Sequence, residues 1–391
     1  MSKSNETTPN VPTLRFKEFS GEWKKIRLGS IIEEIKTYTS DFNKYPLYSF
    51  TIENGVTPKT DRYERNFLVT KDGDTFKIVP PNSFVMNPMN LRFGAINYSK
   101  VKIPVSVSGY YNIFEIENGK NNEFWSAYFL TKTAINLYNS VATGSLIEKK
   151  RVHFSQFIQL SFYVPSDIEK QKITRFLQLI ENRIAVQNKI ISDLKVLKKE
   201  LCNKVFSKGS AVRLGGFIEE VTTRNKSNSC ENVLSVSNKM GFIKQSEQFE
   251  DRTVASENKS NYKVVTEGCF AYNPARINVG SIALLSTYKI GIISPMYVCF
   301  KAKSALDSEY LNFYYQSGFF YKELQKKLEG SVRQCLTYEN MSEILIPYVG
   351  IEEQKAIAAT LNKFATLIAN EEKYLKSLQK QKSYFLNAMF I

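Results

Sequence analysis

The sequence predicts an α+β protein in which two tandem mixed α/β domains are joined by two long helices pairing as an antiparallel coiled coil, with a pseudo-twofold internal repeat. Three observations lead there. Residues 166–206 and 351–391 contain no Pro or Gly and carry apolar residues at heptad spacing. The segments before them share residues at a constant offset. A chain of 391 residues at 43% hydrophobic content can also bury two separate cores.

The first long helix is expected within residues 166–206. At about 1.5 Å per residue it would be about 60 Å long, so it needs a partner for its apolar face. Gln187 and Lys198 are the two polar positions in this face. Its apolar residues recur in alternating steps of four and three, the pattern of a coiled-coil seam, at Ile173, Leu177, Ile180, Ile184, Ile191, Leu194, Leu201 and Val205.

The second long helix repeats the first at the C-terminus. Its polar interruptions are Glu371 and Lys382, and both differences, 371 − 187 and 382 − 198, equal 184. Because a globular segment separates the two helices, we expect them to pair antiparallel. The matching apolar positions are Ile357, Leu361, Phe364, Ile368, Leu375, Leu378, Phe385 and Met389.

The segments before the helices are also duplicated. Residues 27–29 (Arg-Leu-Gly) recur at 213–215, and 213 − 27 = 186. This register holds for more than a hundred residues, so each half of the chain is one copy of a domain followed by a helix. Matched pairs at this offset include Asn87 and Asn273, Pro88 and Pro274, Gly94 and Gly280, Tyr128 and Tyr314, Gly144 and Gly330, and Ser145 and Ser331.

The repeat predicts four segments: a first domain at 1–165, a long helix at 166–207, a second domain at 208–349 and a last helix at 350–391. Residues 1–12 are expected to be disordered, and the apolar residues that follow to form an arm lying on the domain. Ser166 and Glu169 form a capping box before the first long helix. In the first domain we expect strands at 48–52, 75–79, 83–86, 105–116 and 160–164, and one helix at 122–138.

The composition narrows the classes of function that this chain can have. The net charge of +15 and the pI of about 9.3 favour a polyanionic partner, although a basic surface alone would look the same. Five scattered cysteines without a CxxC pair and the single His153 argue against structural zinc and against a Ser-His or Cys-His catalyst. No apolar stretch predicts a signal peptide or a membrane span, so a cytoplasmic protein is expected.

The Asn-Pro pairs at 87–88 and 273–274 share two residues with the Asn-Pro-Pro-aromatic motif of amino-methyltransferases. The second proline, the aromatic residue and a Gly-rich cofactor loop are missing, so methyl transfer by this chain alone is disfavoured. Residues 353–355 (Glu-Gln-Lys) contain part of a nuclease motif but lack its upstream Asp. Each Asn-Pro pair is either a structural turn that ends a buried strand or a turn that directs Arg92 or Arg276 at a ligand.

A Gly-Ser loop with basic and polar residues follows the domain helix in each copy, at 143–151 and 330–334. Glycine and serine permit close approach of a backbone, whereas Lys, Arg and Gln side chains contact phosphates and base edges. The alternative is a solvated basic loop. The side chains differ between copies, as expected of two readers with different targets.

Together these residues resemble the specificity (S) subunit of bacterial type I restriction-modification systems. The first helix departs from the family by having Lys170 where the glutamate of its Glu-Gln pair usually falls, and Ser166-Asp167 in place of a Pro-Pro lead. The resemblance covers essentially the whole chain. It is carried by Leu14, Arg15, Phe16, Phe19, Trp23, Leu28 and Gly29, by the Asn-Pro turns and Gly-Ser loops, and by the helix openings at 169–177 and 352–361.

The resemblance implies that each domain is a target-recognition domain reading half of a bipartite double-stranded DNA sequence, with the helix pair setting the spacer. It also implies that this chain is no enzyme and holds no cofactor or metal. Two methyltransferase (modification) subunits would supply S-adenosylmethionine, and restriction/translocase subunits would use ATP and magnesium. The alternatives are a coiled-coil scaffold without DNA recognition and an enzyme acting alone.

The residues expected to contact DNA lie in the Asn-Pro turns and the Gly-Ser loops. In the first domain they are Asn87, Arg92, Thr143, Ser145, Lys149 and Arg151, and in the second Asn273, Arg276, Asn278, Ser331, Arg333 and Gln334.

Overall fold

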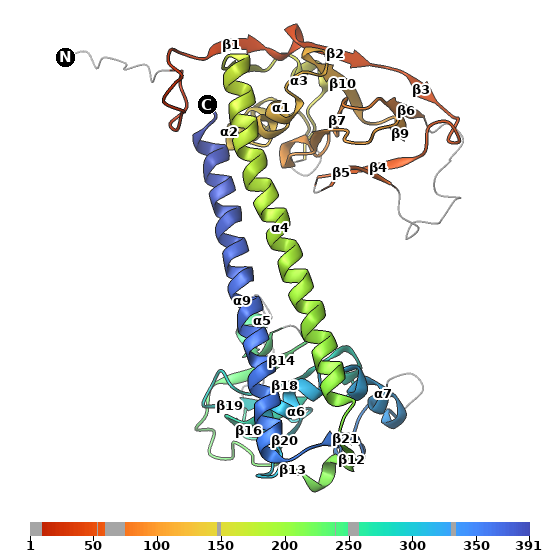
Figure 1. The fold of residues 1–391 in the computed structure, drawn as a ribbon, viewed down its shortest axis with the longest axis vertical. Coiled ribbons are helices and arrows are strands. Elements are labelled where there is room, and N and C mark those ends of the chain that lie inside the picture. The colour runs from red at the N-terminus through yellow and green to blue at the C-terminus, as the bar shows by residue number, and fades with distance from the viewer. Residues whose placement is uncertain are drawn as a thin grey trace, which may run out of the picture. The chain divides into compact units, whose positions relative to one another are not determined.

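The computed structural model describes residues 10–52, 54–58, 75–146, 150–238, 240–248, 258–329 and 334–391. Its contacts divide the chain into two compact units, each described here by itself. The first unit extends to Val186 and includes Leu375–Ile391, and the second is Gln187–Tyr374. Each unit therefore contains one globular domain and a part of both long helices (Figure 1).

The domain of the first unit contains two main sheets among its described residues. One is four-stranded and antiparallel in the order β2-β10-β7-β8, and the other is three-stranded in the order β3-β6-β9. β1 pairs with β11, and β4 forms a hairpin with β5. The strands are β1 Lys24–Arg27, β2 Ile32–Ile35, β3 Tyr38–Thr39, β4 Tyr48–Thr51, β5 Gly55–Pro58, β6 Phe76–Val79, β7 Phe84–Met86, β8 Ile96–Tyr98, β9 Val105–Ser108, β10 Asn112–Ile116 and β11 Ser161–Val164.

Two parts of the first domain differ from the prediction. The expected strand at 105–116 is two strands, because a turn at Ser108–Tyr111 carries the chain from the sheet of β6 to that of β7. The expected helix at 122–138 is also two helices. Thr131 interrupts it by capping the second of them, where its Oγ1 accepts from Ala134 N at 3.2 Å. The helices are α1 Asn122–Phe129, α2 Lys132–Val141 and α3 Phe154–Phe157.

The domain of the second unit repeats this arrangement. A four-stranded antiparallel sheet has the order β13-β20-β17-β18, and β12 pairs with β21. The other sheet, β15-β14-β19-β16, includes one parallel pair, β14 with β19. The elements are β12 Ser210–Arg213, β13 Ile218–Glu220, β14 Val233–Ser237, β15 Gly241–Lys244, α5 Gln245–Gln248, β16 Lys263–Thr266, β17 Cys269–Tyr272, β18 Ile282–Leu284, β19 Ile290–Ile293, β20 Val298–Ala302, α6 Ser308–Tyr314, α7 Gly318–Lys327, α8 Tyr338–Ser342 and β21 Leu345–Tyr348.

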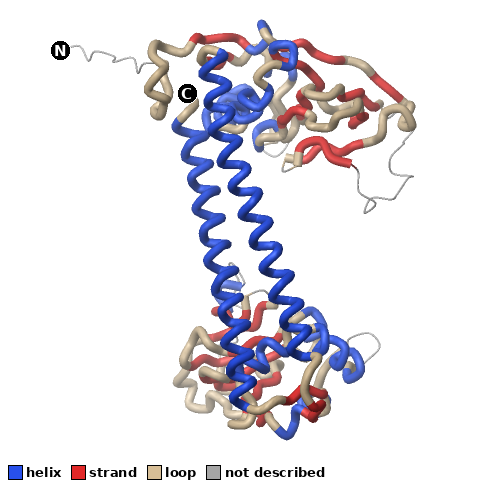
Figure 2. Tube along the Cα trace, in the orientation of Figure 1, coloured by secondary structure: helices blue, strands red, loops and turns tan. Residues whose placement is uncertain are grey.

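The two long helices are α4 (Asp167–Phe206) and α9 (Ile351–Ala388), as the heptad pattern predicts (Figure 2). They run antiparallel within each unit. In the first unit the Phe176 and Phe385 rings lie 4.9 Å apart. In the second, Gln187 donates from Nε2 to Glu371 Oε2 at 2.5 Å. All sixteen predicted apolar seam positions are buried or half-buried.

The polar seam positions also have partners inside their own units. Lys382 pairs with Glu181 at 3.0 Å in the first unit. Lys198 donates to Gln316 Oε1 at 3.3 Å and lies over the Phe313 ring in the second. The seam therefore tolerates these residues because each polar group is satisfied.

The start of α4 differs from the predicted capping box. Glu169 N does donate to Ser166 Oγ, at 3.4 Å. The Glu169 carboxylate, however, is turned to the N-terminal arm, where it accepts two hydrogen bonds from Arg15 at 2.8 Å and one from Trp23 Nε1 at 3.4 Å. The arm also donates from Leu14 N to the Ala388 carbonyl at the end of α9. The expected anchoring of the arm is thus confirmed for Trp23.

Of the predicted disordered lead, residues 1–9 lie outside the described residues, whereas 10–12 are placed. The carbonyl of Asn10 accepts from Trp23 N at 2.9 Å. Pro12 is buried. The arm therefore begins earlier than predicted.

Lys170 corresponds to Gln354 and not to the preceding glutamate, since 354 − 184 = 170. Both side chains are buried at the start of a long helix. Gln354 donates to the carbonyls of Ala305 and Val349. Lys170 donates instead to Glu117 at 2.8 Å. The matched position therefore connects each long helix to its domain, through an ion pair at Lys170 and through amide hydrogen bonds at Gln354.

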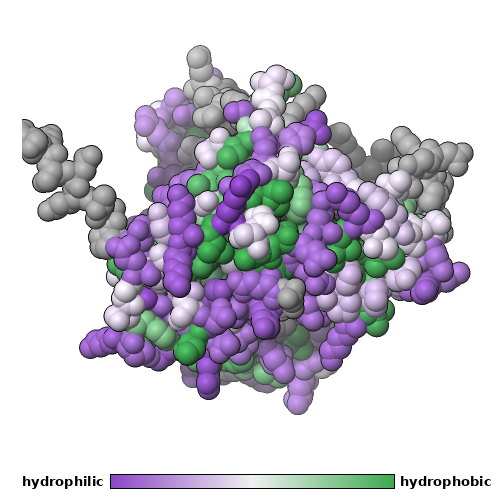
Figure 3. Space-filling model, turned by 90° about the horizontal axis from the view of Figure 1, so that it is seen from above, coloured by the Kyte–Doolittle hydropathy of each residue, from purple (hydrophilic) through white to green (hydrophobic). Residues whose placement is uncertain are grey.

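Hydrophilic side chains dominate the surface seen in Figure 3, with smaller hydrophobic areas between them. Several large apolar residues of the long helices are nevertheless exposed among the described residues, including Ile168, Leu179, Val186, Val196, Leu197 and Tyr384.

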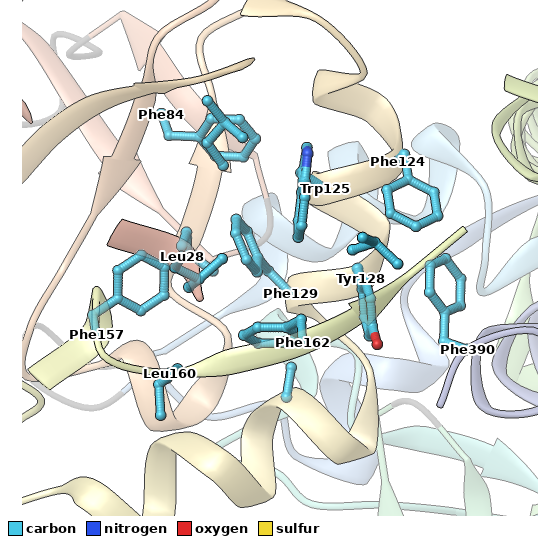
Figure 4. Packing of buried hydrophobic residues seen from close by; sticks show 14 of the residues in the cluster. Leu28, Phe84, Phe124, Trp125, Tyr128, Phe129, Phe157, Leu160, Phe162 and Phe390 are labelled. Carbon is cyan, nitrogen blue, oxygen red and sulfur yellow. The ribbon is translucent and has the colours of Figure 1, made fainter. Parts of the chain in front are cut away.

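The core of the first unit is rich in aromatic residues (Figure 4). Trp125 and Phe129 of α1 pack against Phe162 of β11. Phe390, after the end of α9, packs against Phe124 and is 5% exposed. The end of the chain is therefore part of the first domain's core.

Candidate nucleic-acid interface

Each Asn-Pro pair forms a turn at the end of a buried strand. In the first domain Asn87 Oδ1 accepts from Met89 N at 3.0 Å. In the second, Asn273 Oδ1 accepts from Ala275 N at 3.1 Å. Asn273 is buried at 7% exposure. These side chains therefore hold the turn itself, as the structural interpretation of the motif predicts.

In each domain the loop that follows α2 or α7 is closed by an antiparallel bridge between two residues. Thr143 and Arg151 exchange two backbone hydrogen bonds at 2.9 Å. Glu329 and Cys335 do the same at 3.0 and 2.8 Å. The offset falls from 329 − 143 = 186 to 335 − 151 = 184, so the loop of the second copy is two residues shorter. This difference accounts for the two offsets seen in the sequence.

The turn and the loop meet in both domains through one backbone hydrogen bond. Val152 N, just after the first bridge, donates to the Pro88 carbonyl at 3.0 Å. Leu336 N donates to the Pro274 carbonyl at 3.2 Å. The predicted site residues therefore come together in two clusters, one per domain, although turn and loop lie more than fifty residues apart in sequence.

Within the first cluster Thr143, Ser145 and Arg151 are exposed. Arg92 is half-buried, because its Nε donates to Asn139 Oδ1 on α2 at 2.7 Å and its guanidinium lies 5.6 Å from the Phe93 ring. Lys149 lies outside the described residues. The cluster thus presents both a basic and a hydroxyl-bearing surface, the groups that contact phosphates and base edges.

Within the second cluster Arg276, Asn278 and Gln334 are exposed. Ser331 and Arg333 lie outside the described residues. Nothing in the structure tests DNA contact for any of the twelve predicted residues, so their contacts stay a prediction.

Sequence reasoning missed side chains that other segments bring to the turns. Phe93 is 63% exposed beside Arg92, and Asn139 holds Arg92. In the second domain, Asn238 at the β14–β15 hairpin donates to the Val279 carbonyl at 3.4 Å. Phe93 could have been noticed as an aromatic residue next to a predicted contact. Asn139 and Asn238 carry no signal in the sequence, because only the fold brings them there.

A matched lysine, buried in the first domain and half-buried in the second, supports the neighbouring hairpin in both domains. Lys77 Nζ donates to the Tyr111 carbonyl at 2.8 Å. Lys263, its match at 263 − 77 = 186, donates to the Tyr297 carbonyl at 2.9 Å. Burial lowers the pKa of Lys77, opposed by the negative charge of Glu34. These lysines have a structural role in turning the chain between sheets.

Within the described ranges, no group of three or more His, Cys, Asp or Glu residues could hold a metal ion. None of the described helices is long and apolar enough to cross a membrane. The described residues of the two clusters offer basic and polar groups to a ligand.

The comparison with protein families decides the classification. The family model described as "Type I restriction modification DNA specificity domain" matches residues 20–196 and again 199–380. The chain belongs to this family. The two matches confirm the predicted duplication, and they identify the chain as a type I specificity subunit.

A curated relative and a solved structure agree with this classification. A Methanocaldococcus jannaschii protein named as the type I restriction enzyme MjaX specificity subunit is 24% identical over 328 residues, which cover 78% of this chain and 71% of the relative. The crystal structure of a type I restriction-modification S subunit from M. genitalium has a TM-score of 0.55 at 12% identity, covering 97% and 99% of the two chains.

A further solved chain has a TM-score of 0.57 at 14% identity and covers 93% of this subunit and 96% of that chain. Its structure is described as the basis of complex assembly and conformational transition of the type I system. At these identities the two solved structures show the likeness of fold. They support the predicted fold class over 97% and 93% of this chain.

Proposed function

We propose that each globular domain reads one half of a bipartite double-stranded DNA sequence through its turn and loop cluster. The observation that carries the proposal is that this cluster occurs twice, with the same backbone hydrogen bond accepted by the Pro88 and Pro274 carbonyls, in a chain whose family is described by a DNA specificity domain. The backbones match, whereas the side chains differ. Two readers of unlike half-sites require this combination.

The charge supports DNA as the ligand. The formal charge of +15 favours a polyanion, and neutralising phosphates would make binding depend on salt. Arg151 and Arg276 are exposed in the two clusters, where they could pair with phosphates or guanine edges.

We further propose that the chain performs no chemistry itself and works in the cytoplasm with modification and restriction subunits. Those partners would carry S-adenosylmethionine, ATP and magnesium. The long helices α4 and α9 would set the spacer between half-sites, because α4 is one continuous helix of 40 residues, about 60 Å at 1.5 Å per residue.

The test is adenine methylation mapped by direct sequencing of DNA from cells that carry the cognate modification subunits, with and without this chain. A two-part motif with an unspecified gap that appears only with the chain is the expected result. Absence of chain-dependent methylation despite a stable complex would favour the scaffold alternative. Purified chain that methylates or cuts DNA unaided would favour a lone enzyme.

Single substitutions test the two domains separately. R151A is expected to weaken or relax only one half-site and R276A only the other, by about 1–3 kcal/mol each. K25A removes a positive charge from β1 that is also exposed, and it serves as the control. If R151A and R276A altered the same half-site, one reader per domain would be wrong.

A further inference from the structure

The Asn-Pro turns of the two domains share one rigid backbone scaffold. In the first domain Asn90 N donates to the Asn87 carbonyl at 3.1 Å, and Ala95 N donates to the Asn90 carbonyl at 3.1 Å. In the second, Arg276 N donates to the Asn273 carbonyl at 3.0 Å. Ser281 N donates to the Arg276 carbonyl at 3.2 Å, which matches the bond from Ala95 N to the Asn90 carbonyl. Equal bonds at every matched step give both turns the same shape.

The short helices inside the turns are anchored in the same way. They are η4 (Leu91–Phe93) and η8 (Ile277–Val279), and the first residue of each is fully buried. Each ends at a glycine, Gly94 or Gly280, with φ of 87°. This left-handed conformation favours glycine. A buried anchor on one side and a fixed glycine on the other hold the residues between them in place.

The residues between those anchors differ in chemistry at identical positions. Arg92 matches Asn278, since 278 − 92 = 186. Phe93 matches Val279, and these two apolar side chains are 63% and 53% exposed. The scaffold is therefore constant while its outward residues change, which is how one fold presents two specificities.

Residues outside the turns contact both short helices, at the Arg92 side chain in η4 and at the Val279 carbonyl in η8. Asn139 Oδ1 accepts from Arg92 Nε at 2.7 Å, and Asn139 itself donates to the Ile135 carbonyl at 2.9 Å. The contact with Asn139 orients the Arg92 guanidinium against the Phe93 ring. At η8, Asn238 holds the carbonyl of Val279. A side chain oriented in advance loses less entropy when it binds.

Arginine and asparagine differ in the base they prefer. In the major groove the arginine fork donates twice to O6 and N7 of guanine, whereas asparagine pairs with N6 and N7 of adenine. Exposed apolar groups next to such a side chain can contact a thymine methyl group.

We propose that position 92/278 is the matched specificity position of the two domains, with Arg92 favouring guanine in one half-site and Asn278 favouring adenine in the other. This inference rests on the proposed function and extends it to two named residues. Phe93 and Val279 lie beside the reading side chain and make apolar contact with the neighbouring base.

The experiment exchanges the two residues in the full chain, assembled with its modification subunits. R92N and N278R are each expected to change the preferred base at one position of one half-site, with roughly ten- to hundredfold discrimination lost against the original base. The second half-site should stay unchanged in each variant, because the other domain keeps its turn. Thermal unfolding of each variant checks that the turn still folds.

R92K separates base reading from phosphate contact. Lysine keeps the charge but lacks the planar fork, so the guanine preference should weaken while methylation persists. A fall in methylation with the motif intact in R92N, restored to the wild-type level in R92K, would show a phosphate contact and overturn the proposal. An unchanged motif in folded R92N and N278R would overturn it as well.

The two levels of failure are distinguishable. If wild-type chain directs a bipartite motif but the exchanges do not alter it, only this inference fails. If wild-type chain directs no motif, the proposed function fails and the inference with it.

Discussion

Phe390 packs against Tyr128 with the two ring centroids 4.8 Å apart. The same relationship recurs in the other unit, where Phe206 packs against Tyr314 at 5.5 Å, and both residues are matched, since 390 − 206 = 184 and 314 − 128 = 186. Each domain core thus closes around the end of a long helix. The first domain receives that residue from the far end of the sequence, so its stability depends on the last turn of the chain.

F390A should destabilise the first unit by about 3–5 kcal/mol, because it removes a buried aromatic side chain and leaves a cavity. Hydrogen–deuterium exchange measured by mass spectrometry would show faster exchange in α1 and unchanged exchange in α6. Y384A alters an aromatic residue on the same helix that is 61% exposed, and it serves as the control. Equal exchange in F390A and Y384A would contradict the role of Phe390.

The ion pair between Arg15 and Glu169 gives a second prediction. Glu169 is 2% exposed, so E169A leaves Arg15 and Trp23 Nε1 without their acceptor and should cost about 3–5 kcal/mol. The measurement is the free energy of unfolding from urea titration followed by Trp fluorescence, since Trp23 lies at the site.

A matched control exists in the other unit. Glu353 corresponds to Glu169, because 353 − 169 = 184, but it is exposed. E353A should change the free energy of unfolding by less than about 0.5 kcal/mol. Similar losses of unfolding free energy in E169A and E353A would mean that the negative charge at the start of the helix, and not the buried ion pair, stabilises the protein.

The polar contact between Gln187 and Glu371 predicts a non-additive pair of substitutions. Gln187 is 5% exposed and donates to both the side chain and the carbonyl of Glu371. Q187L alone should cost about 1–3 kcal/mol, because the Glu371 carboxylate loses its donor beside an apolar group.

The double variant Q187L/E371L should recover most of that loss, since two apolar residues in a seam pack without desolvating a charge. Urea titration of the wild type, both single variants and the double variant completes the cycle. A double variant as unstable as the sum of the single variants would rule out a direct coupling of the two side chains.

The heptad pattern predicted the helices well because the residues at its apolar positions are buried or half-buried in the structure. Ile173 and Leu361 are among the most buried residues of α4 and α9. The same pattern could not assign partners to the polar positions. Lys198 meets Gln316, which lies between α6 and α7, whereas the matched Lys382 meets Glu181 on the facing helix. The choice depends on which domain surface lies nearby, and no local pattern records it.

The sequence predicted which segments form the candidate DNA interface, but it did not predict how those segments contact one another. The Asn-Pro turns and the loops were both identified from the repeat, yet the bond from Val152 to Pro88 that joins them is a contact between backbones distant in sequence. Glu169 shows the same limit at the helix start. A local capping pattern predicted its partner, and an arginine in the N-terminal arm took the carboxylate instead.

Thiol reactivity gives the last prediction. Cys202, Cys269 and Cys299 are buried, whereas Cys230 and Cys335 are partly exposed. Burial raises the pKa of Cys202 to about 11, and for Cys299 to about 12, above the ordinary value of 9.0. A rise from 9.0 to about 11 makes the reactive thiolate roughly a hundredfold rarer at pH 8.

Native protein at pH 8 should therefore react at Cys230 and Cys335 with a thiol reagent such as Ellman's reagent, and all five cysteines of the chain should react after denaturation. C230S/C335S should abolish the fast reaction without changing the unfolding midpoint. Because Cys335 closes the loop of the second cluster, bound DNA should also slow its modification while leaving Cys230 unaffected. Fast modification of Cys202 in folded protein would mean that the end of α4 opens readily, against the packing of Phe206 beside it.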